Sequence, residues 1–324
     1  MKKLTAKWLA LVIAVLIAGA AFITGTPSAK KEEPVPKHPT LHKTIEVDGV
    51  KIFYREAGRK DAPTLLLLHG YPTSSHMFRH LIEDLSHRYH LLAPDYPGFG
   101  QSAQPPMADF SYTFDNIAKI VEGFLQALNV EKFSVYLMDY GAPIGYRIAA
   151  KYPERIESLI VQNGGAYEEG LREFWDPIKK YWNEYTEENG KALEGFHAPD
   201  GLKWQYTHGV QNVETISPDN WNIDLQHLTR PGNNAIQLAM FYDYRTNVAL
   251  YPEWQAYFRE HQPPTLVVWG KNDHIFPADG AHSYKQDLKN IEFHLLDTGH
   301  FALEEEGDAI ADHILRFLAK NNIE

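Results

Sequence analysis

Residues 133–145 read FSVYLMDYGAPIG. Their first part, Phe133–Leu137, predicts a buried strand, and the residues from Gly141 onward predict a helix. Asp139-Tyr140-Gly141 lies between the two elements, where Gly141 permits the tight backbone of a strand-to-helix turn. The stretch therefore predicts that a carboxylate, Asp139, is displayed at the point where a strand turns into a helix.

The alternation of apolar strands and amphipathic helices extends over most of the chain. The strands lack the polar–apolar alternation of a half-exposed sheet, so we expect a mostly parallel sheet that helices cover on both faces. Asp48-Gly49 marks a hairpin turn between the first two strands. The sequence thus predicts an α/β fold with eight strands, at residues 44–47, 51–55, 64–68, 90–93, 133–137, 158–162, 265–269 and 293–296.

Between residues 165 and 262 this alternation stops. The stretch has no convincing strand and is rich in tryptophan and tyrosine. A helical insertion of this size is expected to form a cap over the carboxyl edge of the strands, where open α/β sheets bind ligands. We therefore predict a core of residues 43–164 and 263–324 and a helical cap of residues 165–262, with most cap aromatics joining cap to core.

The N-terminus has the layout of an export signal. Three lysines precede an apolar run from Trp8 to Ile23, and small residues follow it. This order is typical of a secretory signal peptide, with candidate cleavage sites after Ala20 and Ala29. A retained membrane anchor is the alternative. We predict a signal peptide or anchor at residues 1–29, a Lys/Glu/Pro-rich linker at 30–42, and an exported domain that meets a membrane only through the N-terminal segment.

Composition excludes several classes of partner and cofactor. The formal net charge is −11, which argues against a nucleic-acid partner. The chain has no cysteine, so disulfides, thiolate metal sites and a cysteine nucleophile are excluded. His38, His42 and the cap histidines show no metal-ligand spacing, and there is no glycine-rich phosphate loop or dinucleotide fingerprint. We expect a protein that needs neither metal nor cofactor.

Residues suited to chemistry fall at the carboxyl ends of the predicted strands. Asp139, Asp273 and His300 each follow a strand, and so does His69-Gly70-Tyr71-Pro72. The chain order of nucleophile, acid and histidine is that of the triad in α/β-hydrolases. These residues are therefore the candidates for a catalytic site.

Each candidate also has a structural interpretation. Asp139 could cap the helix that follows it, since aspartate suits the N-cap position. Asp273 could be a turn residue, and His300 an ordinary structural histidine. Asp95 and Asn163 follow other strands and are further candidates for the acid.

Taken together, the motifs resemble those of α/β-hydrolases of the epoxide hydrolase and haloalkane dehalogenase branch, in which aspartate replaces serine at the nucleophile turn. The resemblance covers roughly Lys43 to the C-terminus. It implies that Asp139 is the nucleophile and that His300 is the base, oriented by Asp273. The motifs are HGYPTSS (69–75), DYPGFGQS (95–102), LMDYG (137–141), GKND (270–273) and GHF (299–301).

The same resemblance narrows the reaction. A carboxylate that attacks an sp³ carbon displaces an alkoxide or a halide and leaves an ester on Asp139. Water activated by His300 then hydrolyses that ester. The backbone N–H groups of Tyr71 and Tyr140 are expected to stabilise the resulting oxyanion. The implied substrate is a small apolar organic molecule, with water as the second reactant.

The leaving group is the feature that the sequence constrains least. Tyr244, in Asp243-Tyr244-Arg245, resembles the cap tyrosine that donates a proton to the epoxide oxygen in epoxide hydrolases. Tyr181 and Tyr185 are candidates for a second such donor. We therefore predict an epoxide hydrolase with Tyr244 as the proton donor.

Two alternatives stay open. The segment HGYPTSS is closer to dehalogenases, and fluoroacetate dehalogenases share the Asp-Tyr-Arg motif, so haloalkane or haloacid dehalogenation is the first. Two residues count against ordinary haloalkane dehalogenation. Tyr71 stands where such enzymes often have asparagine, and Tyr140 stands where they typically have tryptophan. Tyr140 departs from typical epoxide hydrolases as well. The second alternative is a non-catalytic protein of this fold that binds a small ligand beneath the cap.

Overall fold

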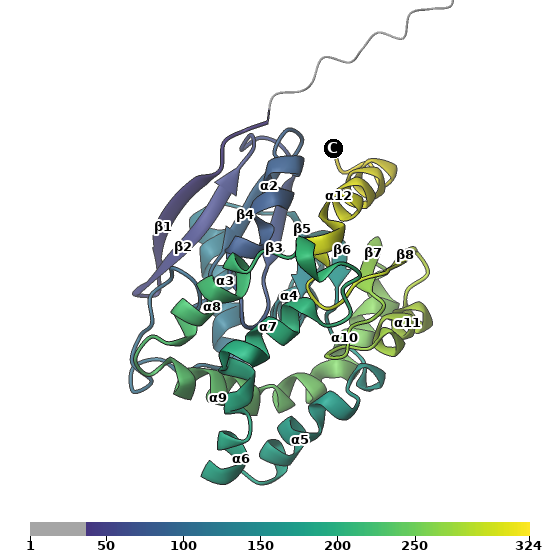
Figure 1. Cartoon of the computed structure of the whole chain (residues 1–324). Helices are drawn as coiled ribbons and strands as arrows, with labels where there is room; N and C mark the ends of the chain where they lie inside the picture. The colour runs from purple at the N-terminus through teal and green to yellow at the C-terminus, as the bar shows by residue number, and fades with distance from the viewer. Residues whose placement is uncertain (1–36) are drawn as a thin grey trace, which may run out of the picture. The chain divides into compact units, whose positions relative to one another are not determined.

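The computed structural model describes residues 37–324, which form an eight-stranded sheet flanked by helices (Figure 1). The expected signal peptide or anchor at residues 1–29 lies outside the described residues. Within residues 37–324, no helix is both long enough and apolar enough to cross a membrane. The strands are β1 (Leu41–Val47), β2 (Val50–Ala57), β3 (Thr64–Leu68), β4 (His90–Pro94), β5 (Phe133–Met138), β6 (Ile156–Gln162), β7 (Thr265–Gly270) and β8 (Ile291–Leu296).

The strand order β1-β2-β4-β3-β5-β6-β7-β8 places β5 near the middle of the sheet. Strand β2 is antiparallel to both of its neighbours, and the other pairs are parallel. The turn Asp48-Gly49 has positive φ at both residues, as the predicted hairpin requires. The predicted fold class, a mixed and mostly parallel sheet of eight strands, is confirmed. Residues that follow β3, β5, β7 and β8 therefore meet at one edge.

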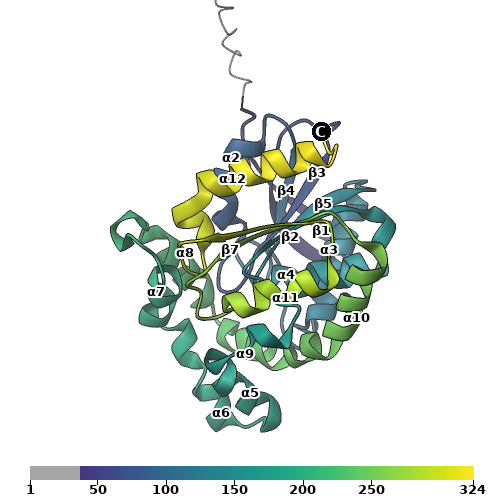
Figure 2. The same ribbon diagram turned by 90° about the vertical axis from the view of Figure 1, so that its right-hand side faces the viewer.

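Successive residues of the central strands pack on opposite faces of the sheet. Leu137 faces the layer of α3, α4, α10 and α11, whereas Tyr136 and Met138 face α2 and α12. Figure 2 shows the strands between these two helical layers. The flanking helices are α2 (Arg79–Leu85), α3 (Phe114–Ala127), α4 (Gly141–Lys151), α10 (Arg245–His261), α11 (Ala278–Asp287) and α12 (Ala302–Lys320).

The segment between β6 and β7 is helical, as predicted, but not all of it belongs to the cap. In α10, Trp254 and Phe258 lie 5.4 and 5.2 Å from the ring of Tyr146 in α4. The spacing of these aromatics gives α10 one apolar face, which is buried in the core layer. The predicted cap of residues 165–262 therefore includes a helix, α10, that packs on the core. The cap helices are α5 (Asp176–Asn183), α6 (Glu187–Lys191), α7 (Pro199–Thr207), α8 (Asp219–Leu228) and α9 (Asn233–Asp243).

The folded part of the chain also begins earlier than the predicted Lys43. The Lys37 ammonium lies 2.7 Å from Asp84, and the His38 N–H donates to Ser86 Oγ. Strand β1 pairs with β2 from Leu41 onward. The predicted linker at 30–42 thus overlaps the fold, because backbone pairing and these polar contacts hold residues that composition alone marked as a tether.

The turn between β5 and α4 is tightly constrained. Asp139 has a φ of +49°, in the left-handed region that costs energy for a residue with a side chain. A Cβ placed on Gly141 would lie 2.2 Å from the carbonyl oxygen of Leu68 in β3. Glycine is therefore required at 141, because the start of α4 packs directly against the neighbouring strand.

We predict that Gly141→Ala lowers the free energy of unfolding by roughly 1–3 kcal/mol, the usual cost of an overpacked core site. Unfolding by urea, followed by tryptophan fluorescence, measures the change. Gly307→Ala in α12 is the matched control, because a Cβ there meets no atom within 4 Å. Equal stability of the two variants would contradict the assigned role of Gly141.

Candidate active site

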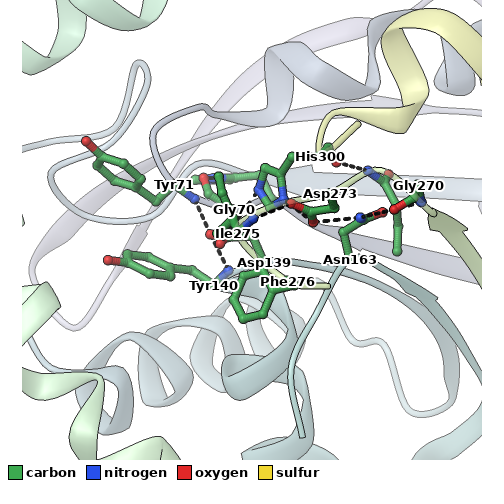
Figure 3. A network of polar contacts seen from close by, with 12 residues as sticks. Gly70, Tyr71, Asp139, Tyr140, Asn163, Gly270, Asp273, Ile275, Phe276 and His300 are labelled. Carbon is green, nitrogen blue, oxygen red and sulfur yellow. Dashed lines mark hydrogen bonds and ion pairs between the residues drawn. The ribbon is translucent and has the colours of Figure 1, made fainter. Parts of the chain in front are cut away.

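Asp139 is held by two backbone N–H groups that converge on the same oxygen. The N–H of Tyr71 and the N–H of Tyr140 each donate to Asp139 Oδ1 at 2.6 Å (Figure 3). The loop that carries Tyr71 can approach so closely because residue 70 is glycine, where a Cβ would lie 2.4 Å from that of Asp139. The Asp139 residue is 4% exposed. Asp139 Oδ1 is thus fixed by the backbone, while Oδ2 accepts neither of these bonds.

His300 and Asp273 lie on the other side of Asp139. His300 Nδ1 is 2.8 Å from Asp273 Oδ2. Because a carboxylate only accepts hydrogen bonds, Nδ1 carries the proton and Nε2 of the neutral ring has the free lone pair. Nε2 is buried without a hydrogen-bond partner and lies 3.8 Å from Asp139 Oδ2. The imidazole is thus oriented to accept a proton beside the carboxyl group of Asp139.

The other two candidates for the acid have different surroundings. Asn163 donates to Asp273 Oδ2 at 2.7 Å and accepts from the N–H of Gly270 at 3.0 Å. Asn163 therefore holds Asp273 in place. Its position after β6 in the sequence did not reveal this role. Asp95 accepts from the N–H groups of Ser75 and Gln101, both at 2.7 Å. Its carboxylate braces neighbouring loops and makes no bond to His300.

Tyr244 lies beside the site, with its ring 6.0 Å from that of Tyr140. Its side chain is fully buried, with the ring 4.6 Å from Trp175 and 6.1 Å from Trp182. Its hydroxyl lies 3.5 Å from that of Tyr251, and Tyr244 is not among the residues that line the cavity at Asp139. The two indoles, whose rings are 6.0 Å apart, both pack against the ring of Tyr244. The structure thus shows Tyr244 packed among aromatic side chains, and its role as the proton donor stays a prediction.

The two tyrosines predicted as candidates for a second donor lie elsewhere. Tyr181 and Tyr185 line a separate surface hollow, and Tyr185 is 62% exposed. Neither lines the cavity at Asp139. Among residues 37–324, the structure therefore brings neither of these tyrosines to the nucleophile.

A small, mostly apolar cavity lies between Asp139 and the cap. Its volume is about 20 Å³, which is room for roughly one water molecule. An organic substrate therefore requires the cap side chains to part. The lining residues are Tyr71, Asp139, Tyr140, Phe174, Trp175, Ile178, Phe196, Gln205, Phe241 and Ile275.

Burial controls the charge states at the site. It raises the pKa of Asp139 to about 6, although His300 and the two N–H donors act in the opposite direction. Burial alone would lower the pKa of His300, but the carboxylates of Asp273 and Asp139 outweigh it and raise that pKa above 6.5. The two groups therefore favour each other's charged form, which is a carboxylate beside an imidazolium.

One group of metal-ligand type lies within the described chain, and the sequence did not reveal it. Glu292, His294 and His313 have ligand atoms within 4.8 Å of one another. The two imidazoles stack 3.7 Å apart at 25°, so their lone pairs lie in nearly parallel planes instead of converging on one point. These residues belong to β8 and α12 and do not line the cavity at Asp139.

An aspartate on a strand-to-helix turn, a histidine–aspartate pair after later strands and a helical insertion together define an α/β hydrolase. Residues 63–307 match the family model described as alpha/beta hydrolase fold, and the chain belongs to this family.

Proteins similar to this chain include an epoxide hydrolase and a haloalkane dehalogenase, the two enzyme classes that the motifs suggested. An uncharacterized hydrolase of Saccharomyces cerevisiae is 43% identical over 87% of this chain and 98% of the relative. A haloalkane dehalogenase of Mesorhizobium japonicum is 31% identical over 90% and 94% of the two chains. Epoxide hydrolase 1 of Caenorhabditis elegans is 23% identical over 85% and 70%. The resemblance to the aspartate-nucleophile branch is confirmed at the level of family.

The crystal structure of Cfl2 from Burkholderia cenocepacia matches this fold with a TM-score of 0.72. The identity is 24%, over 88% of this chain and 98% of that one. At this level of identity, the likeness supports the shared fold alone.

We predict that the Asp139 carboxyl titrates with a midpoint near pH 6, well above the ordinary aspartate value of about 4. The measurement is ¹³C NMR of carboxyl-labelled protein, with the resonance assigned by its loss in Asp139→Asn. In His300→Gln the midpoint should rise further, because the imidazolium that favours the carboxylate is gone. A midpoint near 4 in the wild-type protein would contradict the effect of burial.

Proposed function

We propose that this protein hydrolyses epoxides through a covalent ester on Asp139. The observation that carries the proposal is the unequal treatment of the two carboxyl oxygens. Oδ1 accepts both N–H donors, whereas Oδ2 lies 3.8 Å from His300 Nε2. A carboxylate held only to cap a helix would not need a histidine–aspartate pair at its second oxygen.

The first step forms the ester. Asp139 Oδ2 attacks an epoxide carbon, the ring C–O bond breaks, and the released oxygen takes up a proton. The apolar lining of the cavity favours this step, because it desolvates the attacking carboxylate and accepts an apolar substrate. The product of the step is an ester between Asp139 and the ring-opened alcohol.

The second step hydrolyses the ester. His300 Nε2 takes a proton from water, and the hydroxide adds to the carboxyl carbon of Asp139. Negative charge develops on Oδ1, where the N–H groups of Tyr71 and Tyr140 already point. The ester bond then breaks, and His300 returns the proton to the departing alcohol. The net reaction adds one water to an epoxide and gives a 1,2-diol.

The donors around the cavity favour oxygen over halide as the leaving group. The N–H of Trp175, a lining residue, is bound to the carbonyl of Ile275 at 2.7 Å. The N–H of Trp182 is likewise bound to the carbonyl of Phe241. Of the two lining tyrosines, Tyr140 has a hydroxyl without a hydrogen-bond partner, and an O–H donor suits an oxygen that must gain a proton.

Dehalogenation is the second candidate function. The haloalkane dehalogenase relative is 31% identical over nearly the whole chain. The same nucleophile and base would serve, with a halide departing in place of the ring oxygen. The two functions therefore differ in the leaving group and share the ester.

We predict that His300→Gln accumulates the ester, because Asp139 still attacks but water is no longer activated. Intact-protein mass spectrometry after incubation with styrene oxide, a haloalkane and a haloacetate measures the adduct. Asp139→Asn should form no adduct. An adduct with the epoxide alone supports epoxide hydrolysis. An adduct with only the haloalkane or the haloacetate supports dehalogenation.

The absence of any adduct would contradict the covalent mechanism, provided that His300→Gln is folded by circular dichroism. Binding of these compounds without turnover by the wild-type protein would instead favour the non-catalytic alternative.

We further propose that the protein is exported, on the basis of the lysine-led apolar run from Trp8 to Ile23. N-terminal sequencing should find a chain that begins after Ala20 or Ala29, or an intact chain in the membrane fraction. Val15→Arg should block export, because a charge interrupts the apolar run. An intact wild-type chain in the soluble cytoplasmic fraction would overturn this proposal.

A further inference from the structure

The hydroxyl of Tyr140 is a buried polar group without a partner. The side chain is 2% exposed and lines the cavity at Asp139. Its oxygen has no hydrogen-bond partner within the described part of the chain. A buried hydroxyl without a hydrogen-bond partner lowers the stability of the fold. A ligand oxygen in the cavity would satisfy this group.

The neighbouring donors are already engaged. The hydroxyl of Tyr71 lies 2.7 Å from His197 Nδ1 and 3.1 Å from the carbonyl oxygen of Phe196, so it ties the core to the cap. Tyr244 lies outside the lining, beside Tyr251. The N–H of Trp175 is bound to a carbonyl. Of the phenol and indole donors that line the cavity, Tyr140 alone has its hydrogen free.

The position of the ring suits a leaving group. Figure 3 shows the side chains of Tyr71 and Tyr140 extending from Asp139 on the side away from His300. In a displacement at carbon, the leaving atom departs on the side opposite the attacking oxygen. A substrate between Asp139 and the cap would therefore direct its leaving atom away from the nucleophile and toward the part of the cavity that Tyr140 lines.

We propose that the Tyr140 hydroxyl donates the proton to the leaving oxygen of the substrate. The inference rests on the proposed epoxide hydrolysis and assigns its proton donor to the core instead of the cap. As the ring C–O bond breaks, the O–H proton of Tyr140 passes to the ring oxygen. After hydrolysis, the proton left on the regenerated Asp139 carboxyl returns through solvent to the phenolate. Each cycle thus restores both groups.

The assignment also specifies the substrate class. A phenol donates a strong hydrogen bond to an ether oxygen, whereas a carbon-bound halogen is a weak acceptor that leaves without a proton. Loss of the Tyr140 hydroxyl should therefore slow the opening of an epoxide far more than the displacement of a halide.

The rate of ester formation in the His300→Gln background tests the proposal. Adding Tyr140→Phe should slow the reaction with styrene oxide by roughly 10²–10⁴-fold, the usual scale of general acid catalysis. Halide displacement should change by less than about tenfold, because it needs no proton. Tyr257→Phe is the matched control. Its hydroxyl is also buried and unpartnered, but it does not line the cavity, so both rates should stay unchanged.

Binding to the Asp139→Asn variant gives a second readout that needs no turnover. Styrene oxide and cyclopropylbenzene share shape and size, but only the epoxide has an acceptor oxygen. With Tyr140 present, the epoxide should bind more tightly by roughly two- to tenfold, the worth of one neutral hydrogen bond. Tyr140→Phe should abolish that preference, and Tyr257→Phe should keep it.

These results separate the two proposals. If His300→Gln forms an ester with epoxides and Tyr140→Phe leaves the rate unchanged, the proton-donor role is wrong and epoxide hydrolysis stands. A large loss in Tyr244→Phe without one in Tyr140→Phe would return the role to the cap. If no epoxide reacts at all, epoxide hydrolysis fails. Equal binding of the two ligands by Asp139→Asn would then overturn the role of Tyr140 as well.

Discussion

The site depends on two backbone N–H groups that meet at one oxygen of Asp139. One comes from the loop after β3 and the other from the turn after β5, so the parallel pairing of these strands sets the distance between them. The geometry requires a left-handed backbone at Asp139 and glycine at positions 70 and 141, where a side chain would collide. With Oδ1 fixed in this way, Oδ2 is left for chemistry beside His300.

Much of the fold and part of the site follow from local sequence. Buried parallel strands are continuous apolar runs, and residues that follow them must meet at one edge, so the amino-acid sequence alone groups Asp139, Asp273 and His300. The place of α10 and the role of Asn163 could not be foreseen. Both depend on tertiary contacts: the packing of α10 on α4, and a side-chain amide that reaches Asp273 from the next strand.

Tyr244 shows what a matching motif leaves open. The sequence places a tyrosine before an arginine in the cap, but the position of its hydroxyl is decided by Trp175 and Trp182, which pack against the ring. Tyr140 is the reverse case. Its backbone N–H was expected at the site, whereas its hydroxyl carried no sequence signal, because an unpartnered group is recognisable only once its surroundings are known. Motifs thus identified positions in the chain, and packing determined which atoms face the cavity.

The unequal oxygens of Asp139 have a consequence for the fate of atoms in the proposed cycle. Oδ2 forms the bond to the substrate carbon and leaves with the product, while the oxygen of water enters the carboxyl group in its place. The diol from the first turnover therefore carries an oxygen that was part of the polypeptide. In water labelled with a heavy oxygen isotope, the first diol would be unlabelled. The label would be found in the carboxyl group of Asp139, so a single turnover would leave the protein itself labelled.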